Sequence, residues 1–125
     1  MAKTILIVDD SASVRQVVGI ALKGAGYQVL EAGDGAQALH KLQGLGGQKI
    51  NLVISDVNMP NMDGISFVKA MKALPAYRFT PVIMLTTESQ ENKKREGQAA
   101  GAKAWVVKPF NPPQLLSAVE KLVLP

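Results

Sequence analysis

The chain has 125 residues, 47% of them hydrophobic, a formal net charge of +4 and no cysteine. This length suits one domain and the apolar fraction suits a folded core, while the missing cysteines exclude disulfides and thiolate metal sites. No basic run is interleaved with aromatic residues, so we expect no nucleic-acid partner. No apolar run reaches membrane-spanning length and no signal-peptide pattern occurs, so we expect a cytoplasmic protein without a membrane partner.

Apolar runs bounded by turn-forming residues predict five strands. They cover residues 4–8, 27–32, 51–55, 81–86 and 104–107. Between and after them, apolar residues at helical spacing predict five helices, which cover residues 11–22, 35–42, 65–74, 89–100 and 112–123. Asp34 and Asn111 are predicted N-caps, Pro112 suits the first helical position, and Gly101 is a predicted helix end. The glycine-rich stretch 44–47 is predicted to be a loose connector.

Strands and helices alternate along the whole chain, without a break that would divide it into domains. This alternation predicts a parallel sheet that is covered by helices on both faces. Five strands are too few for a closed eight-stranded barrel, so we expect a doubly wound, flavodoxin-like α/β sheet. The strand order that we adopt, 2-1-3-4-5, is taken from known flavodoxin-like proteins.

Polar and charged residues stand at the ends of the predicted strands. Asp9 and Asp10 follow the first strand, Asp56 follows the third, Thr86 ends the fourth and Lys108 follows the fifth. Each residue alone has an ordinary structural explanation, such as a turn, a strand end or a solvated charge. Because the carboxyl ends of parallel strands meet at one edge of the sheet, the five residues together predict a single site.

Three carboxylates at one edge of a sheet repel one another unless a cation lies between them. A hard divalent ion with oxygen ligands fits this pattern, and Mg²⁺ commonly combines one or two carboxylates with waters and phosphate oxygens. Lys108 adds an ammonium group for an incoming anion, and Thr86 adds a hydroxyl group. A carboxylate nucleophile, a metal ion, a lysine and a hydroxyl suit phosphoryl transfer to Asp56.

With these residues in place, the chain resembles the receiver domain of two-component response regulators over essentially its whole length. The matching motifs are Val8-Asp9-Asp10, Ser55-Asp56, Met59-Pro60, Met62-Asp63-Gly64, Leu85-Thr86-Thr87 and Val107-Lys108-Pro109-Phe110. Residues 58–64 and 105–110 are especially similar to the stand-alone chemotaxis regulators of the CheY type. The resemblance implies a single receiver domain over residues 1–125, with no output domain.

The resemblance implies a role for each residue of the strand-end group. Asp56 accepts a phosphoryl group from the phosphohistidine of a histidine kinase, and Lys108 contacts that group. Mg²⁺ is held by Asp10, Asp56 and the backbone carbonyl of Asn58, while Asp9 acts through the water shell of the metal. The protein is then a phosphoacceptor that assists its own phosphotransfer and autodephosphorylation, and not an enzyme for other substrates.

The resemblance also implies a switch. Thr86 moves toward the phosphoryl group, and Trp105 stands where the family usually has tyrosine or phenylalanine. An indole is larger than either ring, so it rotates inward less readily. The adjoining helix carries Lys93 and Lys94, which we expect to meet an acidic segment of a partner. The expected output surface is made by the fourth helix, the fifth strand and the fifth helix.

We expect the partners to be a chemotaxis-type histidine kinase and the flagellar motor switch protein or another target protein, with a phosphatase as a further candidate and the chain itself a monomer. Asn58 and Glu88 stand where the family tunes dephosphorylation, and the bond between Lys108 and Pro109 is expected to be cis. Two alternatives are a single-domain receiver in another phosphorelay and a small aspartate-nucleophile phosphatase. Such phosphatases carry a second aspartate two positions after the nucleophile, where this chain has Asn58.

Overall fold

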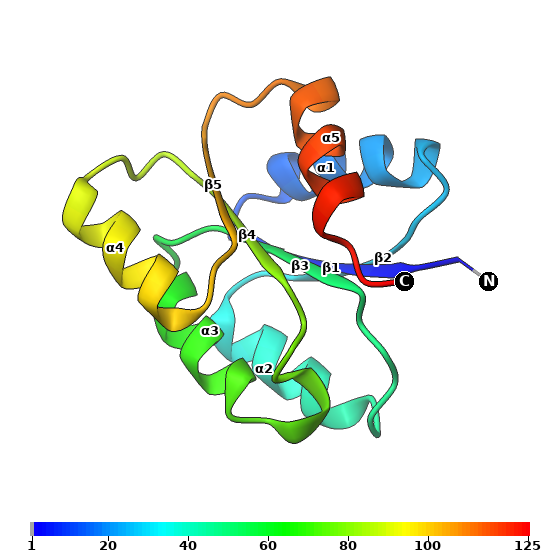
Figure 1. Cartoon of the computed structure of the whole chain (residues 1–125), viewed down its shortest axis with the longest axis horizontal. Coiled ribbons are helices and arrows are strands. Elements are labelled where there is room, and N and C mark those ends of the chain that lie inside the picture. The colour runs from blue at the N-terminus through cyan, green and yellow to red at the C-terminus, as the bar shows by residue number, and fades with distance from the viewer. Residues whose placement is uncertain (1) are drawn as a thin grey trace.

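The computed structural model describes residues 2–125 and confirms the flavodoxin-like α/β fold (Figure 1). Five parallel strands form one sheet in the expected order β2-β1-β3-β4-β5. The strands are β1 (Thr4–Val8), β2 (Gln28–Ala32), β3 (Leu52–Ser55), β4 (Val82–Thr86) and β5 (Ala104–Val107). The helices are α1 (Ala12–Gly24), α2 (Gly35–Gly44), α3 (Gly64–Lys72), the short 3₁₀ helix η1 (Pro75–Tyr77), α4 (Glu91–Ala100) and α5 (Pro112–Leu122). Among the described residues, no helix combines the length and the apolar character needed to cross a membrane.

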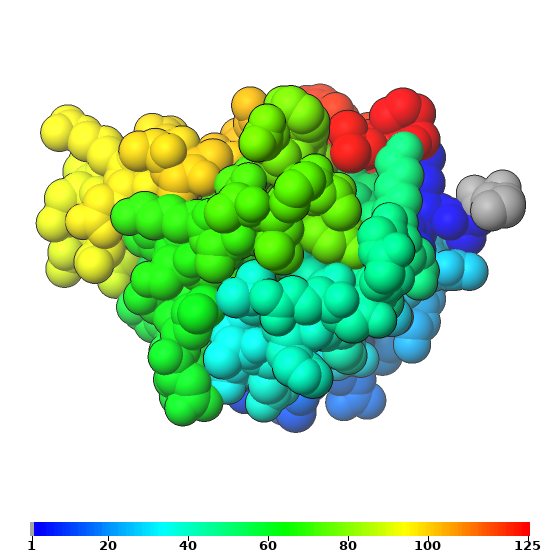
Figure 2. Space-filling model, turned by 90° about the horizontal axis from the view of Figure 1, so that it is seen from below, coloured from blue at the N-terminus to red at the C-terminus, as the bar shows by residue number. Residues whose placement is uncertain are grey.

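Helices α1 and α5 cover one face of the sheet, and α2 and α3 cover the other (Figure 1). A hydrophobic core lies on each face. Successive residues of a strand point to opposite faces, so Leu6 and Val8 pack against α2 and α3, while Ile5 and Ile7 pack against α1 and α5. Figure 2 shows the face that α2 and α3 cover, with α4 beyond α3. Because both faces are covered, all five residues of β1 are buried, and the strand is a continuous apolar run in the sequence.

The helix caps that the sequence predicts are present. Asp34 Oδ1 accepts from the Gln37 N–H at 2.8 Å at the start of α2. Asn111 Oδ1 accepts from the Gln114 N–H at 3.2 Å at the start of α5. Each bond satisfies a backbone donor that has no partner within the helix. Gly101 ends α4 with φ 119°, a left-handed conformation that favours glycine.

Several element boundaries differ from the predicted ones by one or two residues. α4 begins at Glu91, two residues later than predicted, because Gln90 has the extended conformation of an N-cap residue. α3 ends at Lys72, because Pro75 cannot donate the hydrogen bond that a continuing helix needs, and η1 follows. α2 runs on to Gly44, so only the later part of the predicted connector lies outside a helix.

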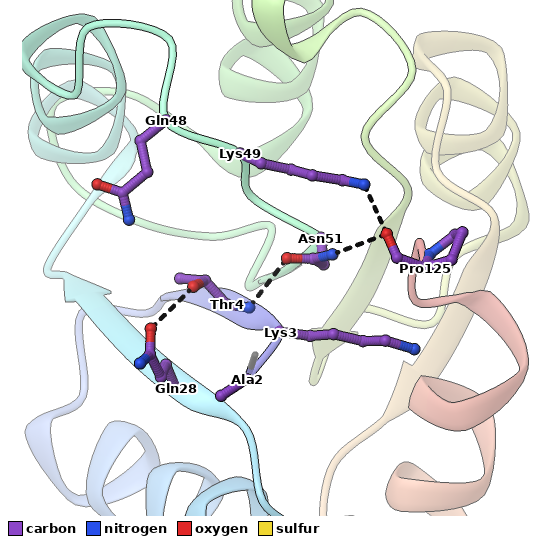
Figure 3. A pocket seen from close by; sticks show the side chains of 8 residues that line it. All are labelled: Ala2, Lys3, Thr4, Gln28, Gln48, Lys49, Asn51 and Pro125. Carbon is purple, nitrogen blue, oxygen red and sulfur yellow. Dashed lines mark hydrogen bonds between the residues drawn. The ribbon is translucent and has the colours of Figure 1, made fainter.

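Asn51 ties the amino ends of the strands to the last residues of the chain (Figure 3). Its Oδ1 accepts from the Thr4 N–H at 3.0 Å, and its Nδ2 lies 3.5 Å from the Pro125 carbonyl oxygen. The same Nδ2 donates to the Leu124 carbonyl at 3.0 Å. A hollow of about 410 Å³ lies here, with Lys3 and Lys49 among the residues that line it. It lies at the opposite edge of the sheet from the predicted site, so we assign these residues a role in closing the fold.

The loop after β3 passes very close to its own beginning at Gly64. The Gly64 N–H donates to the Val57 carbonyl at 2.8 Å. A Cβ atom at this position would lie 1.9 Å from the Asp56 carbonyl oxygen, so only glycine fits. Gly64 therefore fixes where the chain leaves the Asp56 loop and begins α3.

We expect Gly64→Ala to lower the free energy of unfolding by about 3 kcal/mol, because the backbone beside Asp56 must move to admit the methyl group. Gly44→Ala is the matched control, since a Cβ atom there meets nothing within 4 Å. Urea unfolding followed by circular dichroism measures both variants. A Gly64→Ala protein as stable as Gly44→Ala would show that the loop adapts without cost.

Candidate functional site

Three carboxylates meet at the carboxyl edge of the sheet. β1 and β3 are neighbours, with Val8 opposite Ser55, so the next residues, Asp9 and Asp56, are adjacent. One carboxylate oxygen from each of Asp9, Asp10 and Asp56 lies within 4.8 Å of the others. Asp9 and Asp56 are 2% and 7% exposed, whereas Asp10 faces solvent. The predicted acidic group is thus assembled, and it is open to solvent at Asp10.

Lys108 joins this group from the end of β5. Its ammonium nitrogen lies 2.8 Å from Asp9 Oδ2 and 3.1 Å from Asp56 Oδ2. The backbone sets this position, because the Lys108 N–H donates to the Thr86 carbonyl at 2.8 Å and continues the pairing of β4 with β5. Burial alone would lower the pKa of Lys108, but the hydrogen bonds and charges of Asp9 and Asp56 outweigh it and hold this pKa above its ordinary value. Lys108 is therefore a permanent cation at neutral pH.

Backbone donors hold the two buried carboxylates in place. Asp56 Oδ1 accepts from the Val57 N–H at 2.6 Å, and Asp9 Oδ1 accepts from the Ser11 N–H at 2.9 Å. Arg15 Nη1 donates to the Asp9 carbonyl at 2.6 Å and fixes the backbone of that residue. Each carboxylate thus binds the backbone through Oδ1 and turns Oδ2 toward Lys108. The oxygens that face the site are oriented in advance, which favours reaction there.

Thr86 is buried at the end of β4, and its hydroxyl bonds to the loop that follows. Thr86 Oγ1 accepts from the Glu88 N–H at 3.1 Å. The Glu88 carboxylate accepts from Asn58 Nδ2 at 3.4 Å, and the Glu88 carbonyl accepts from Trp105 Nε1 at 2.9 Å. The four residues predicted for switching and dephosphorylation are therefore joined to one another through Glu88.

Lys93 and Lys94, which were predicted for the output surface, lie partly exposed on α4. Lys93 Nζ is 3.6 Å from Glu96 Oε2 on the same helix. Burial would raise the pKa of Asp63, but hydrogen bonds from Ser66 and the nearby charge of Lys93 hold this pKa below its usual value. Since Asp63 caps α3, the charge of Lys93 acts at the start of that helix.

A further aspartate, Asp34, holds the loop between β3 and α3. Asp34 Oδ2 accepts from Asn61 Nδ2 at 2.8 Å, and Asn61 has φ 66°, a left-handed conformation that asparagine tolerates. The bond from the Gln37 N–H, followed by that from Asn61, holds the pKa of Asp34 below its ordinary value against the effect of burial. Asp34 was predicted only as a helix cap, and the structure shows that it also anchors this loop.

The donor set at the carboxyl edge suits a hard divalent cation. The group consists of three carboxylates and the ammonium of Lys108, so an excess of two negative charges remains when all of them are ionised. Mg²⁺ prefers oxygen ligands and typically combines one or two carboxylates with several waters. Asp10 and Asp56 would hold such an ion, with the backbone carbonyl of Asn58 as the third expected ligand and Asp9 acting through water.

A sequence model described as the response regulator receiver domain matches residues 5–120. The chain belongs to the response regulator receiver domain family. Its parallel sheet and five α-helices are those that the resemblance implied, and the Lys108–Pro109 bond of this receiver domain is cis, as expected.

The receiver domain is similar to proteins with different outputs. It is 35% identical to the phosphate regulon transcriptional regulatory protein PhoB of Pseudomonas aeruginosa over 98% of this chain, which spans 52% of PhoB. It is 37% identical to the chemotaxis protein CheY1 of Helicobacter pylori over 93% of each chain. The structure of CheY4 of Vibrio cholerae matches with a TM-score of 0.90 and 48% identity, covering 98% of this chain and 100% of that one. These findings establish a CheY-like response regulator receiver domain.

Two residues that support the site had no predicted role in it. Ser11 was predicted only as part of the helix opening, and it is the N-cap of α1. Serine is a preferred N-cap residue, and the position of Ser11 directly after Asp9 and Asp10 is the sequence signal that could have indicated its contact with the site. No sequence signal marks Arg15, whose contact arises because the first turn of α1 returns its side chain to the Asp9 carbonyl.

We expect Lys108→Met to lower the free energy of unfolding at pH 7 by roughly 1–3 kcal/mol, because it leaves Asp9 and Asp56 without their cation. Lys93→Met is the matched control, since its exposed pair with Glu96 contributes at most about 0.5 kcal/mol. Urea unfolding of both variants measures the difference. An equal loss of stability in the two variants would show that the ammonium of Lys108 does not stabilise the buried carboxylates.

The pH dependence of this difference has a defined sign. Because the pKa of folded Lys108 is raised above its ordinary value of 10.5, its contribution is complete below that value and is lost as the pH rises through the folded pKa. The gap in stability between wild type and Lys108→Met is therefore expected to be constant from neutral to mildly alkaline pH. As the pH rises further, the gap in stability is expected to narrow in strongly alkaline solution.

Proposed function

We propose that Asp56 accepts a phosphoryl group from the phosphohistidine of a histidine kinase in a Mg²⁺-dependent reaction. The observation that carries this proposal is the position of Asp56 Oδ2, which lies 3.1 Å from Lys108 Nζ within the acidic group. Oδ1 is engaged by the Val57 N–H, so Oδ2 is the attacking oxygen. Oδ2 bonds to phosphorus while the P–N bond breaks, and the electron pair of that bond stays with the histidine nitrogen.

Lys108 changes its partner during this step. Its ammonium starts on Asp9 Oδ2 and Asp56 Oδ2. Asp56 Oδ2 loses its charge when it becomes the bridging oxygen, and the ammonium then bonds to the phosphoryl oxygens. A charge-assisted hydrogen bond exists before and after transfer, so the ammonium is never buried without an anion. Thr86, whose hydroxyl bonds to Glu88 before transfer, supplies a further hydroxyl for the new oxygens.

When Mg²⁺ is bound, it supplies positive charge for the phosphoryl oxygens during transfer. Asp10 is its most accessible carboxylate ligand, because Asp10 is the exposed member of the acidic group. Asp9, which is buried and bonded to the Ser11 N–H and to Lys108, is proposed to act through the water shell of the metal ion.

We propose further that this receiver acts on its own phosphoryl group and has no separate substrate. Asn58 stands two positions after Asp56, where an aspartate-nucleophile phosphatase has a second aspartate. An amide cannot serve as the general acid or base that such turnover needs. The side chains of Asn58 and Glu88 bond to each other at 3.4 Å, a position suited to controlling how water reaches the phosphoryl group. These features favour a timed switch with autodephosphorylation.

We propose that phosphorylation alters the binding of a partner at α4, β5 and α5 in a monomeric, cytoplasmic protein. The similarity to CheY1 and CheY4 over nearly their whole lengths supports a role in chemotaxis, with the flagellar motor switch protein as target. A phosphatase that shortens the signal is a further candidate partner. The similarity to PhoB supports the alternative, a receiver in another phosphorelay.

Labelling with acetyl phosphate tests the phosphoacceptor. We expect one phosphoryl group per chain in the wild type with Mg²⁺ and none in Asp56→Asn, because an amide is not a nucleophile here. Asp63→Asn is the matched control, since it changes an exposed aspartate that caps α3, and its labelling is expected to match the wild type. Intact-protein mass spectrometry measures all three. Equal labelling of Asp56→Asn would refute the assignment.

The same assay tests the metal. We expect Asp10→Ala to need at least about tenfold more Mg²⁺ for half-maximal labelling, because it removes the exposed carboxylate ligand. An unchanged Mg²⁺ requirement would show that Asp10 is not a ligand.

Phosphotransfer from purified kinases separates chemotaxis from other relays. We expect transfer from a chemotaxis-type histidine kinase to be faster than transfer from a phosphate-sensing kinase. We also expect the beryllofluoride-treated protein to bind the motor switch protein more tightly than the untreated protein does. A preference for the other kinase, without binding to the motor switch protein, would replace the chemotaxis proposal and leave the receiver assignment intact.

A further inference from the structure

Trp105 of β5 lies between α4 and the loop that follows β4. Its Nε1–H donates to the Glu88 carbonyl at 2.9 Å. At its other end the indole lies against Gly97, so closely that a Cβ atom there would be 2.7 Å from Trp105 Cζ3 and 3.3 Å from Cε3. The ring also packs on the hydrophobic core that α2 and α3 cover. Two separate elements, the loop and α4, therefore hold the indole at its two ends.

Gly97 is an unusual residue for the interior of a helix. Glycine lowers helix stability there, because it loses more conformational freedom on folding than other residues do. Among the ten residues of α4, Gly97 is the buried one, and the helix is otherwise strongly polar. The buried residue of α4 is thus a glycine, which has no side chain and lets another residue approach the helix backbone closely. The space left by the missing side chain is filled by Trp105.

Glu88 links Trp105 to the proposed phosphorylation site. Its N–H donates to Thr86 Oγ1 at 3.1 Å, its carboxylate accepts from Asn58 Nδ2 at 3.4 Å, and its carbonyl accepts from Trp105. Contacts therefore run without interruption from the end of β4, through Glu88 and the indole, to Gly97 in α4.

We propose that Gly97 is a positioning residue of the switch, and that Trp105 transmits movement of Glu88 to α4 without changing its own rotamer. This inference rests on the proposed phosphorylation of Asp56. When Thr86 moves toward the phosphoryl group, the Glu88 N–H loses its acceptor and the loop after β4 is released. Because the indole is bonded to Glu88 and packed on Gly97, the loop, the ring and α4 move together.

Thermal unfolding of the unphosphorylated protein tests the packing of Trp105 on Gly97. We expect Gly97→Ala to lower the Tm of the wild-type chain by roughly 4 °C, because the methyl group displaces the indole. In a Trp105→Leu chain we expect the same substitution to raise the Tm, because alanine favours the helix once the indole is gone. Gly24→Ala is the matched control, since a Cβ atom there meets nothing within 4 Å, and its effect is expected to be the same in both chains.

The direction of the Tm change caused by Gly97→Ala in the two chains decides between the two explanations. The inference would be overturned if Gly97→Ala changed the Tm in the same direction in the wild-type chain and in the Trp105→Leu chain. The loss of stability would then not arise from contact with the indole. The indole N–H gives a second readout in the otherwise wild-type chain. We expect its hydrogen exchange to be faster in Gly97→Ala than in Gly24→Ala, since the bond to Glu88 is lost.

Nuclear magnetic resonance with beryllofluoride and Mg²⁺ tests the transmission. In the wild type we expect amide shifts around Asp56, at Glu88 and along α4, and in Gly97→Ala we expect the shifts along α4 to be lost while those around Asp56 remain. The inference is overturned if the wild type shows no amide shifts along α4, or if these shifts persist in Gly97→Ala. Either result leaves the proposed phosphorylation of Asp56 unaffected. A wild type without shifts around Asp56 refutes the proposed function and this inference with it.

Discussion

The ammonium of Lys108, shared between Asp9 and Asp56, is the interaction on which the site depends. Two buried carboxylates a few ångströms apart are unfavourable alone, because they repel each other and lose their water. The ammonium, 2.8 and 3.1 Å from their oxygens, attracts both carboxylates and neutralises one of their two charges. Asp10 adds a third carboxylate to the group. The site therefore keeps an excess of negative charge, which favours a divalent cation and, with it, an incoming phosphoryl group.

The order of the strands makes this interaction possible. β1 and β3 are neighbours in register, with Val8 opposite Ser55, and Thr86 stands opposite Val107 across β4 and β5. The residues that follow these strands consequently reach the same edge of the sheet. Gly64 then lets the loop after β3 return against its own backbone. A site assembled in this way depends on the alignment of these four strands.

The sequence predicts the sheet and the acidic group for a clear physical reason. Strands that are covered on both faces are continuous apolar runs, and a parallel sheet gathers their ends at one edge. Contacts within loops lack such a periodic signal. The φ of Asn61 and its bond to Asp34 depend on the conformation of a whole loop. Likewise, Gly97 in a polar helix has no interpretation until the structure shows the indole of Trp105 against it.

Borohydride reduction followed by peptide mass spectrometry identifies the phosphorylated residue within the acidic group. An acyl phosphate on an aspartate is reduced to homoserine, so the change in mass marks the residue that carried the phosphoryl group. After treatment with acetyl phosphate and Mg²⁺, we predict this change at Asp56 and at neither Asp9 nor Asp10. Reduction at Asp9 or Asp10 instead, or no reduction in this group, would contradict the proposed transfer of the phosphoryl group to Asp56.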